Sequence, residues 1–146
     1  MYEKILIATD GSDLSKEAEN QGLELAENYG GSVTVLYVED INIPPAMVGP
    51  YALAVEENVE EIQNLGKEIV EEVKEKGKKM GVTVTTMLLK GHPAEEIINQ
   101  ADKFDIVIVG SLGRSGLAHL LIGSVAEKVV RHSPVPVLVV KKQKDH

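Results

Sequence analysis

The sequence predicts an α/β protein in which helices cover both faces of a five-stranded parallel sheet. Short runs of apolar and β-branched residues alternate with longer segments of helical periodicity along the chain. The run 105–109 (DIVIV) is apolar at almost every position, as in a strand that is buried on both faces. The 146 residues are enough for one domain, residues 1–146, with a sizeable core. Together these observations predict a three-layer fold.

The first third of the chain predicts two strands and a helix. Residues 4–9 (KILIAT) read as a buried strand, and the turn 10–13 (DGSD) is rich in helix-capping residues. A helix should follow to about Asn28. Its apolar face is predicted to consist of Ala18, Gly22, Leu25, Ala26 and Tyr29. Residues 32–38 (SVTVLYV) are β-branched and apolar, which predicts the second strand.

The middle of the chain predicts a loop, the longest helix and a third strand. Residues 39–51 contain three prolines and match neither period. We therefore expect a long loop that is mobile in the free protein and orders on binding. A helix is expected at about 55–80, with a solvated, charged outer face. Its apolar stripe is predicted to be Val55, Val59, Ile62, Ile69, Val73 and Met80. The third strand is expected at 82–89, and Pro93 should then open a short helix.

The last third predicts two further strands and the helix between them. A strand at 105–109 leads through a glycine-rich loop into a helix at about 124–132. The last strand is expected at 135–140 (VPVLVV), and the Lys-rich residues 141–146 should be a disordered tail. Right-handed crossovers and a chain that winds one way and then reverses favour the strand order 3-2-1-4-5.

The last strand is then an apolar edge of the sheet. Such edges invite pairing, so we expect a homodimer in which strand 135–140 pairs antiparallel with its copy across a two-fold axis. Pro136 lacks an N–H, so its backbone should face away from the fourth strand. Leu138 and Val140 should share that outward direction, because residues two apart point the same way.

Composition excludes several classes of function. The net charge of −8, from 15 Lys and Arg against 23 Asp and Glu, argues against nucleic acid as a partner. The absence of cysteine excludes disulfides, thiolate catalysis and Cys-ligated zinc. No apolar run approaches the roughly 18 residues of a membrane span, so no membrane contact and a cytoplasmic location are expected. The four histidines lack metal-ligand spacing, and no Ser-His-Asp arrangement can be argued.

A spaced glycine pattern follows the fourth predicted strand. It reads Gly-x-x-Gly, nine residues, then Gly-Ser, and consists of Gly110, Gly113, Gly123 and Ser124. It matches neither the P-loop nor the dinucleotide fingerprint. Glycines between a buried strand and a helix let the backbone approach a ligand closely, and the helix offers unpaired N–H groups. The pattern therefore indicates an anion site, with phosphate as the usual occupant.

At these residues the sequence resembles the universal stress protein family. The resemblance extends from residues 2–12 (YEKILIATDGS) to residues 135–140, and the glycine pattern resembles that of the ATP-binding branch. It implies a Rossmann-like fold of the adenine nucleotide alpha hydrolase type with the same strand order. It also implies that the protein binds ATP or AMP and acts in the stress response as a nucleotide-dependent regulator of an unidentified protein partner.

The nucleotide site is expected where the chain reverses, outside the carboxyl ends of strands 1 and 4. The predicted nucleotide-binding residues are Ala8, Thr9, Asp10, Val38, Val109, Gly110, Gly113, Arg114, Gly123, Ser124 and Val125. The family resemblance alone implies that Ala8, Thr9 and Val38 line the adenine pocket; as apolar or strand residues they would belong to the core in any case.

The polar members of this set each have two interpretations. Asp10 either hydrogen-bonds the ribose or holds Mg²⁺ through water, or it only shapes the entry to a helix. Arg114 either pairs with phosphate oxygens or is a solvated loop residue. Ser124 either contacts phosphate or, with Glu127, forms an S-x-x-E capping box that needs no ligand.

Two functions from different classes fit these residues. The first is a regulatory protein that binds ATP or AMP, with Mg²⁺ accompanying ATP. The second is a slow ATP hydrolase or phosphoryl-transfer enzyme that uses the same site. The enzyme needs a residue that positions water or accepts a proton near the γ-phosphate, and Asp10 is the only plausible carboxylate. We favour the regulatory protein; a third alternative, a structural dimer without ligand, would reduce the glycines to turn residues.

Overall fold

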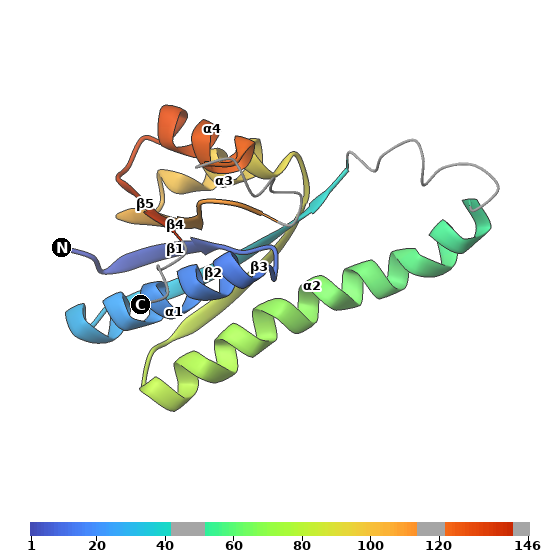
Figure 1. The fold of residues 1–146 in the computed structure, drawn as a ribbon. Helices are drawn as coiled ribbons and strands as arrows, with labels where there is room; N and C mark the ends of the chain where they lie inside the picture. Colours follow the sequence, from blue (N-terminus) through green and yellow to red (C-terminus); the bar gives the residue numbers. More distant parts are fainter. Residues whose placement is uncertain (42–51, 114–121, 142–146) are drawn as a thin grey trace, which may run out of the picture.

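The fold is a five-stranded parallel sheet with the strand order β3-β2-β1-β4-β5 (Figure 1). The computed structural model describes residues 1–41, 52–113 and 122–141, and for residues 52–63 the backbone alone. The strands are β1 (Lys4–Ala8), β2 (Ser32–Asp40), β3 (Val84–Gly91), β4 (Ile106–Gly110) and β5 (Val137–Val140). The predicted strand order is confirmed, and the chain reverses direction between β1 and β4.

Four helices form the two outer layers. The first two, α1 (Asp13–Tyr29) and α2 (Ala52–Met80), cover one face of the sheet, and the shorter helices α3 (Pro93–Ala101) and α4 (Ser124–His132) cover the other (Figure 1). Each parallel crossover places a helix on the sheet, as in other doubly wound α/β folds. The predicted three-layer architecture is therefore confirmed.

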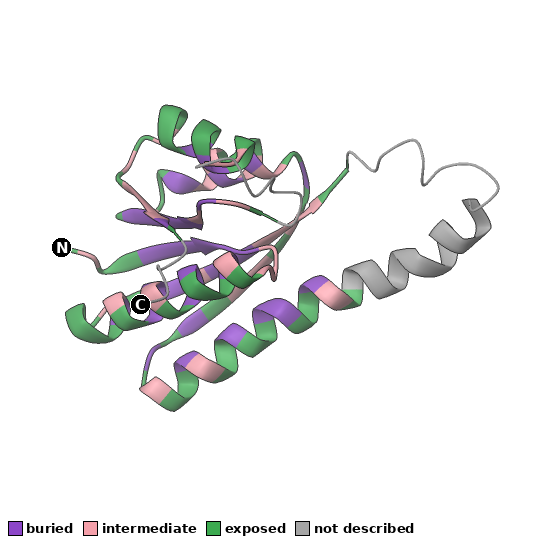
Figure 2. Ribbon diagram, viewed as in Figure 1, coloured by how far each residue is buried: buried purple, intermediate pink, exposed green. Residues whose placement is uncertain are grey.

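The central strand β1 divides the core into two halves. Ile5 and Ile7 pack with α1 and α2, whereas Leu6 and Ala8 face α3 and α4, because side chains alternate along a strand. Ile5, Leu6 and Ile7 are fully buried, and most of β1 is coloured as buried in Figure 2. Helix α1 lies close to the sheet at Gly22, where an added Cβ would stand 2.4 Å from Ile7 Cδ1.

The predicted apolar face of the first helix is partly wrong. Ala18, Gly22 and Ala26 are buried as expected and Leu25 packs half-buried against the same core, but Tyr29 is exposed. The buried face also includes Leu23. Tyr29 lies in the last turn of α1, beyond the sheet, and its ring packs edge-on against Tyr2 with centroids 5.3 Å apart. In the second helix, Ile69 and Val73 are buried as predicted.

All five strands differ from their predicted bounds by one or two residues at an end, and the reason is clear for β2 and β3. β2 continues to Asp40, because Glu39 and Asp40 pair in register with Lys90 and Gly91 of β3. β3 begins at Val84 instead of residue 82, because the Val82 N–H donates to the Gly77 carbonyl at 2.8 Å and so completes the end of α2. Such a bond to the last turn is typical of a helix that ends at a left-handed glycine, here Gly81 with φ +75°.

The predicted orientation of the last strand is wrong. The Pro136 carbonyl accepts from the Val107 N–H at 3.0 Å, and the Val140 carbonyl accepts from the Ser111 N–H at 2.8 Å. These backbone groups, and by alternation those of Leu138, therefore face β4, while those of Val137 and Val139 face outward. Pro136 has no N–H that could donate to β4. It is compatible with this direction because it precedes β5, where the hydrogen-bond ladder with β4 does not need a donor.

The helices show no membrane-spanning character. Within residues 1–41, 52–113 and 122–141, none is both long enough and apolar enough to cross a bilayer.

Candidate functional site

The carboxyl ends of β1 and β4 lie side by side at the point where the chain reverses. The loop after β1 (residues 9–12) meets the end of β4 and the residues that follow it (110–113) there, as the sequence predicted. The start of α4 is tied to the same place, because the Gly123 N–H donates to the Ser111 carbonyl at 2.6 Å. Three chain segments with ligand-binding potential are thus brought together by the topology of the sheet.

Asp10 organises the loop between β1 and α1. Its Oδ1 accepts hydrogen bonds from the Ser12 N–H at 2.9 Å and from the Ser15 hydroxyl at 2.8 Å. Ser12 in turn caps α1, since its hydroxyl accepts from the Ser15 N–H at 3.4 Å. Asp10 therefore has the helix-entry role that the sequence left open.

The other oxygen of Asp10 lies against the glycine loop. A Cβ added at Gly113 would stand 2.7 Å from Asp10 Oδ2, a distance that real Cβ atoms do not show. Because Oδ1 is held by Ser12 and Ser15, the carboxylate cannot simply swing away. Glycine at position 113 therefore allows the backbone after β4 to pass close to the carboxylate.

Helix α4 begins without a side-chain cap. Its N-cap residue is Gly123, with φ −80° and ψ 167°, and Ser124 is already the first helical residue. The predicted capping box of Ser124 and Glu127 is therefore wrong. Glu127 instead forms an ion pair with Arg131, one turn further along, at 2.8 Å. The capping box is therefore removed as an explanation of Ser124, and Ser124 and Val125 are exposed residues of the first turn of α4, at the positive end of the helix.

Several predicted site residues are placed in the core. Ala8 and Val109 are buried, and Val38 is half-buried, all in the layer between the sheet and α3 and α4. Gly110 serves packing, because an added Cβ would lie 3.2 Å from the Leu14 carbonyl carbon and oxygen in the first turn of α1. Ala8, Val38 and Val109 therefore pack in the core next to the site, and Gly110 lets α1 approach β4. All four have a structural role whether or not a ligand is bound.

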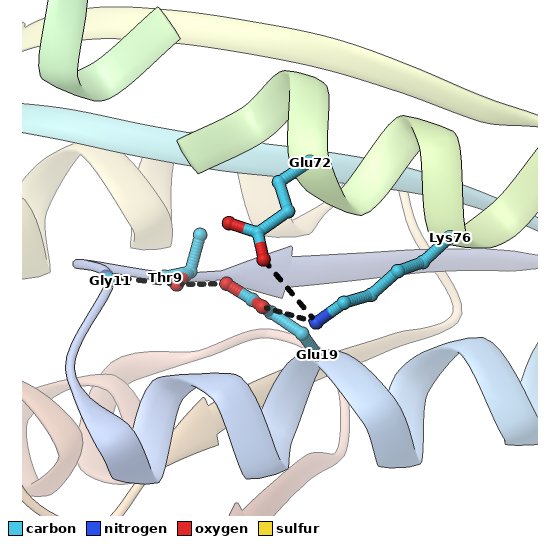
Figure 3. A network of polar contacts seen from close by, with 5 residues as sticks. All are labelled: Thr9, Gly11, Glu19, Glu72 and Lys76. Atoms are coloured by element: carbon cyan, nitrogen blue, oxygen red, sulfur yellow. Dashed lines mark hydrogen bonds and ion pairs between the residues drawn. The ribbon is translucent and has the colours of Figure 1, made fainter. Parts of the chain in front are cut away.

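The Thr9 hydroxyl has its partners on the side of the sheet that α1 and α2 cover. The Thr9 N–H donates to the Leu36 carbonyl at 3.0 Å, and the hydroxyl donates to Glu19 Oε1 at 2.7 Å. The same hydroxyl oxygen accepts from the Gly11 N–H at 3.1 Å. Lys76 of α2 approaches the second oxygen of Glu19, at 4.0 Å, and Glu72 at 4.0 Å (Figure 3). A polar network therefore adjoins the loop that carries Asp10, buried at Thr9 and Glu19 and open to solvent at Lys76 and Glu72.

Burial raises the pKa of the Glu19 carboxyl above its usual range, and the hydrogen bond from Thr9 and the charge of Lys76 offset this only in part. The charge of Lys16 also lowers the pKa of Glu19, and the charge of Glu72 raises it. Glu19 is 2% exposed, so its charged form loses nearly all of its hydration.

This raised pKa predicts a pH-dependent stability. The folded state holds the Glu19 proton more tightly than the unfolded state, so its contribution to the free energy of unfolding is complete below about pH 4.3. That contribution should be lost as the pH rises from there through the higher folded pKa. A Glu19→Gln variant should therefore gain stability relative to wild type between pH 4 and pH 7, as measured by urea unfolding at several pH values. If the difference in the free energy of unfolding between Glu19→Gln and wild type stays the same across this range, the raised pKa of Glu19 is contradicted.

Some predictions fall outside the described residues. Arg114 and His119 lie in the segment 114–121, and most of the predicted mobile loop lies in 42–51. Conversely, the structure adds three buried polar residues to the surroundings of the site, namely Ser15, Glu19 and Ser111. The sequence held a signal for Glu19, because it is an acidic residue on the same helical face as Ala18, Gly22 and Leu23.

Asp10 is the residue that would contact a metal ion brought by a nucleotide. Among the residues that the structure describes, no three His, Asp or Glu side chains are grouped so that they could hold a metal on their own. Mg²⁺ usually relies on one or two carboxylates together with the phosphates of its ligand and several waters. A single carboxylate beside a glycine loop fits that arrangement.

Comparison with known proteins identifies the relatives of this chain. The sequence model of the Universal stress protein family matches residues 1–141. Universal stress protein MJ0531 of Methanocaldococcus jannaschii is 39% identical, over 99% of this chain and 85% of the relative. The solved structure of MJ0577, from the same organism, is 32% identical and covers 99% of each chain with a TM-score of 0.76.

A further solved structure is a universal stress protein in complex with cAMP. It is 25% identical, covers 97% of this chain and 98% of its own, and superposes with a TM-score of 0.69. The match to the family model spans nearly the whole chain, and these relatives agree with it. The chain belongs to the universal stress protein family.

Proposed function

We propose that this protein is a nucleotide-dependent regulator that binds ATP or AMP at the junction of β1, β4 and α4. The observation that carries the proposal is the start of α4, which has no side-chain cap and is held beside the glycine loop by the Gly123–Ser111 hydrogen bond. The N–H groups in the first turn of a helix, reached through glycines, are suited to phosphate. The relative solved with cAMP supports an adenine nucleotide as the ligand class.

The proposal gives each segment a task. The N–H groups of Ser124 and Val125 and the Ser124 hydroxyl bind phosphate, while Gly113 and Gly123 allow the backbone to come close. Arg114 pairs with phosphate oxygens. The Asp10 carboxylate binds the ribose or, through water, the Mg²⁺ that accompanies ATP. Ala8, Thr9, Val38, Val109 and Gly110 form the floor beneath the nucleotide. The proposed location is the cytoplasm, where adenine nucleotides are available.

The hydrogen bonds of Asp10 favour a regulatory protein over an enzyme. Asp10 Oδ1 is committed to Ser12 and Ser15, so the carboxylate is fixed as part of the helix entry. A phosphoryl-transfer enzyme would need a group that orients the attacking water as well as one that holds the metal. The alternative, slow hydrolysis of ATP at the same site, is compatible with these contacts as a side activity.

Calorimetric titration tests the proposal. Purified wild-type protein should bind ATP in the presence of Mg²⁺, and also AMP, with one nucleotide per chain. CTP serves as the matched control, because it carries the same triphosphate on a different base. Absence of heat for every adenine nucleotide, in a protein shown to be folded by circular dichroism, would refute the proposed function.

An Asp10→Asn variant distinguishes a contact between Asp10 and Mg²⁺ from a contact between Asp10 and the nucleotide itself. It should bind Mg-ATP more weakly than wild type while its affinity for AMP changes less, because AMP needs little metal. Hydrolysis by the wild type should be far slower than the roughly 1–100 s⁻¹ of kinases. Titration with both nucleotides and a phosphate-release assay measure these effects. A turnover within the kinase range would favour the enzyme, and an equal loss for both nucleotides would remove the metal role.

The proposed assembly is a homodimer through β5. The outward backbone groups of this edge belong to Val137 and Val139, and the strand is apolar throughout. A Val139→Pro variant removes an outward donor, whereas Val139→Thr keeps it and serves as the control. Light scattering should find dimers for wild type and Val139→Thr and mainly monomers for Val139→Pro. A folded Val139→Pro variant that stays dimeric would exclude this edge as the interface.

A further inference from the structure

Glu19 is a buried acid that the proposed nucleotide site does not touch. It lies on α1, is 2% exposed, and accepts a hydrogen bond of 2.7 Å from the Thr9 hydroxyl. Keeping a carboxyl group at such a position costs free energy unless the group has partners. Figure 3 shows these partners between β1, α1 and α2.

The Thr9 hydroxyl has a single proton, and its direction is set by two neighbours. The Gly11 N–H donates to Thr9 Oγ1 at 3.1 Å, so the oxygen must accept on that side. The proton can then point only to an acceptor elsewhere, and Glu19 Oε1 supplies it. Without this acceptor the hydroxyl would be a buried donor lacking a partner and would turn to find another.

The bond to Gly11 holds the turn that leads into the site. Gly11 has φ +80°, a left-handed conformation, and it stands between Asp10 and the helix cap Ser12. The Asp10 carboxylate receives the Ser12 N–H, so its orientation depends on this turn. Contacts thus run without interruption from Glu19 through Thr9 and Gly11 to the carboxylate beside the glycine loop.

We infer that Glu19 is a positioning residue for the nucleotide site, acting through the Thr9 hydroxyl on the Gly11 turn. This inference rests on the proposed function, since it assigns to Glu19 a share of the affinity for adenine nucleotides. It also explains why an acidic residue occupies the buried face of α1. An apolar residue there would pack as well but would give the Thr9 hydroxyl no acceptor.

Lys76 provides a matched control on the far side of the same carboxyl group. It lies 4.0 Å from Glu19 Oε2, the oxygen that does not receive the Thr9 hydroxyl, and 4.0 Å from Glu72. Replacing it changes the charge next to Glu19 but leaves the path from Glu19 to Gly11 intact. Effects on general stability and effects on the loop can therefore be distinguished.

The experiment compares nucleotide affinity among variants of the full chain. Glu19→Leu and Thr9→Val should each weaken Mg-ATP binding by about three- to tenfold, the worth of one hydrogen bond. The double variant should lose no more than either single one, because both break the same path. Glu19→Gln should retain the affinity, since its amide oxygen still accepts from Thr9, and Lys76→Met should retain it as well.

A second readout does not depend on the nucleotide. Hydrogen exchange of the Gly11 amide, followed by NMR in the free protein, should be faster in Glu19→Leu and Thr9→Val than in wild type, Glu19→Gln and Lys76→Met. If wild type binds no nucleotide, the proposed function fails, and this exchange rate still tests the positioning. Unchanged Gly11 exchange in Thr9→Val, additive losses of affinity in the double variant, or wild-type affinity in folded Glu19→Leu would each overturn the inference.

Discussion

A Gly123→Val variant is expected to lose nucleotide affinity by about tenfold or more while it remains folded. The Gly123 N–H bonds the Ser111 carbonyl at 2.6 Å, and an added Cβ would stand 3.3 Å from that carbonyl oxygen and 3.6 Å from Leu112 Cα. The two added methyl groups of valine must push the start of α4 away from the residues after β4. The phosphate donors of the helix would then leave the glycine loop.

The backbone at Gly123 does not itself require glycine. Its φ of −80° is open to any residue, so the variant carries little conformational strain. A Gly123→Ala variant adds the Cβ alone, so its loss of nucleotide affinity should be smaller than that of Gly123→Val. Calorimetry with Mg-ATP measures the affinity, and thermal unfolding provides the control for folding. Wild-type affinity in a folded Gly123→Val variant would remove the start of α4 from the site.

An Ile7→Ala variant should lower the free energy of unfolding by about 2–5 kcal/mol. Ile7 is fully buried at the centre of the sheet and packs against α1 at Gly22. Removal of its side chain leaves a cavity between β1 and α1, which the rigid packing of sheet and helix cannot close completely. Urea unfolding monitored by circular dichroism gives the value.

The same contact predicts a change of sign at Gly22. In wild type, Gly22→Ala should destabilise, because its Cβ would stand 2.4 Å from Ile7 Cδ1 and 3.2 Å from Ile108 Cδ1. In the Ile7→Ala background the new methyl group enters the vacated space, and alanine also favours the helix by about 1 kcal/mol over glycine. Gly22→Ala should therefore stabilise that background. The same sign in both backgrounds would show that α1 does not approach the sheet as described.

The sheet could be predicted because each strand carries its own signal. Runs such as 4–9 and 105–109 are apolar on both faces, which only an inner parallel strand requires. The strand order followed from crossover handedness and one reversal, and with it the meeting of residues 9–12 and 110–113. Local pattern and chain topology were sufficient for the architecture and for the place of the candidate site.

Details that depend on register or on contacts distant in sequence could not be predicted. A Ser-x-x-Glu segment suits a capping box, but the N-cap of α4 is Gly123, whose N–H donates to the Ser111 carbonyl. Pro136 has two allowed directions, and only its place relative to the ladder decides between them. The partners of Glu19 come from β1 and α2, so its role is invisible along α1 alone.

NMR titration of the labelled wild-type protein with Mg-ATP tests the location of the site most directly. The account predicts that the largest shifts fall on the amides of residues 9–12, 110–113 and 123–125, which lie far apart in sequence and meet only at the junction of β1, β4 and α4. Shifts concentrated instead on the groove between α3 and α4, lined by Ile98, Asn99 and Lys128, or no shifts at saturating nucleotide, would contradict it.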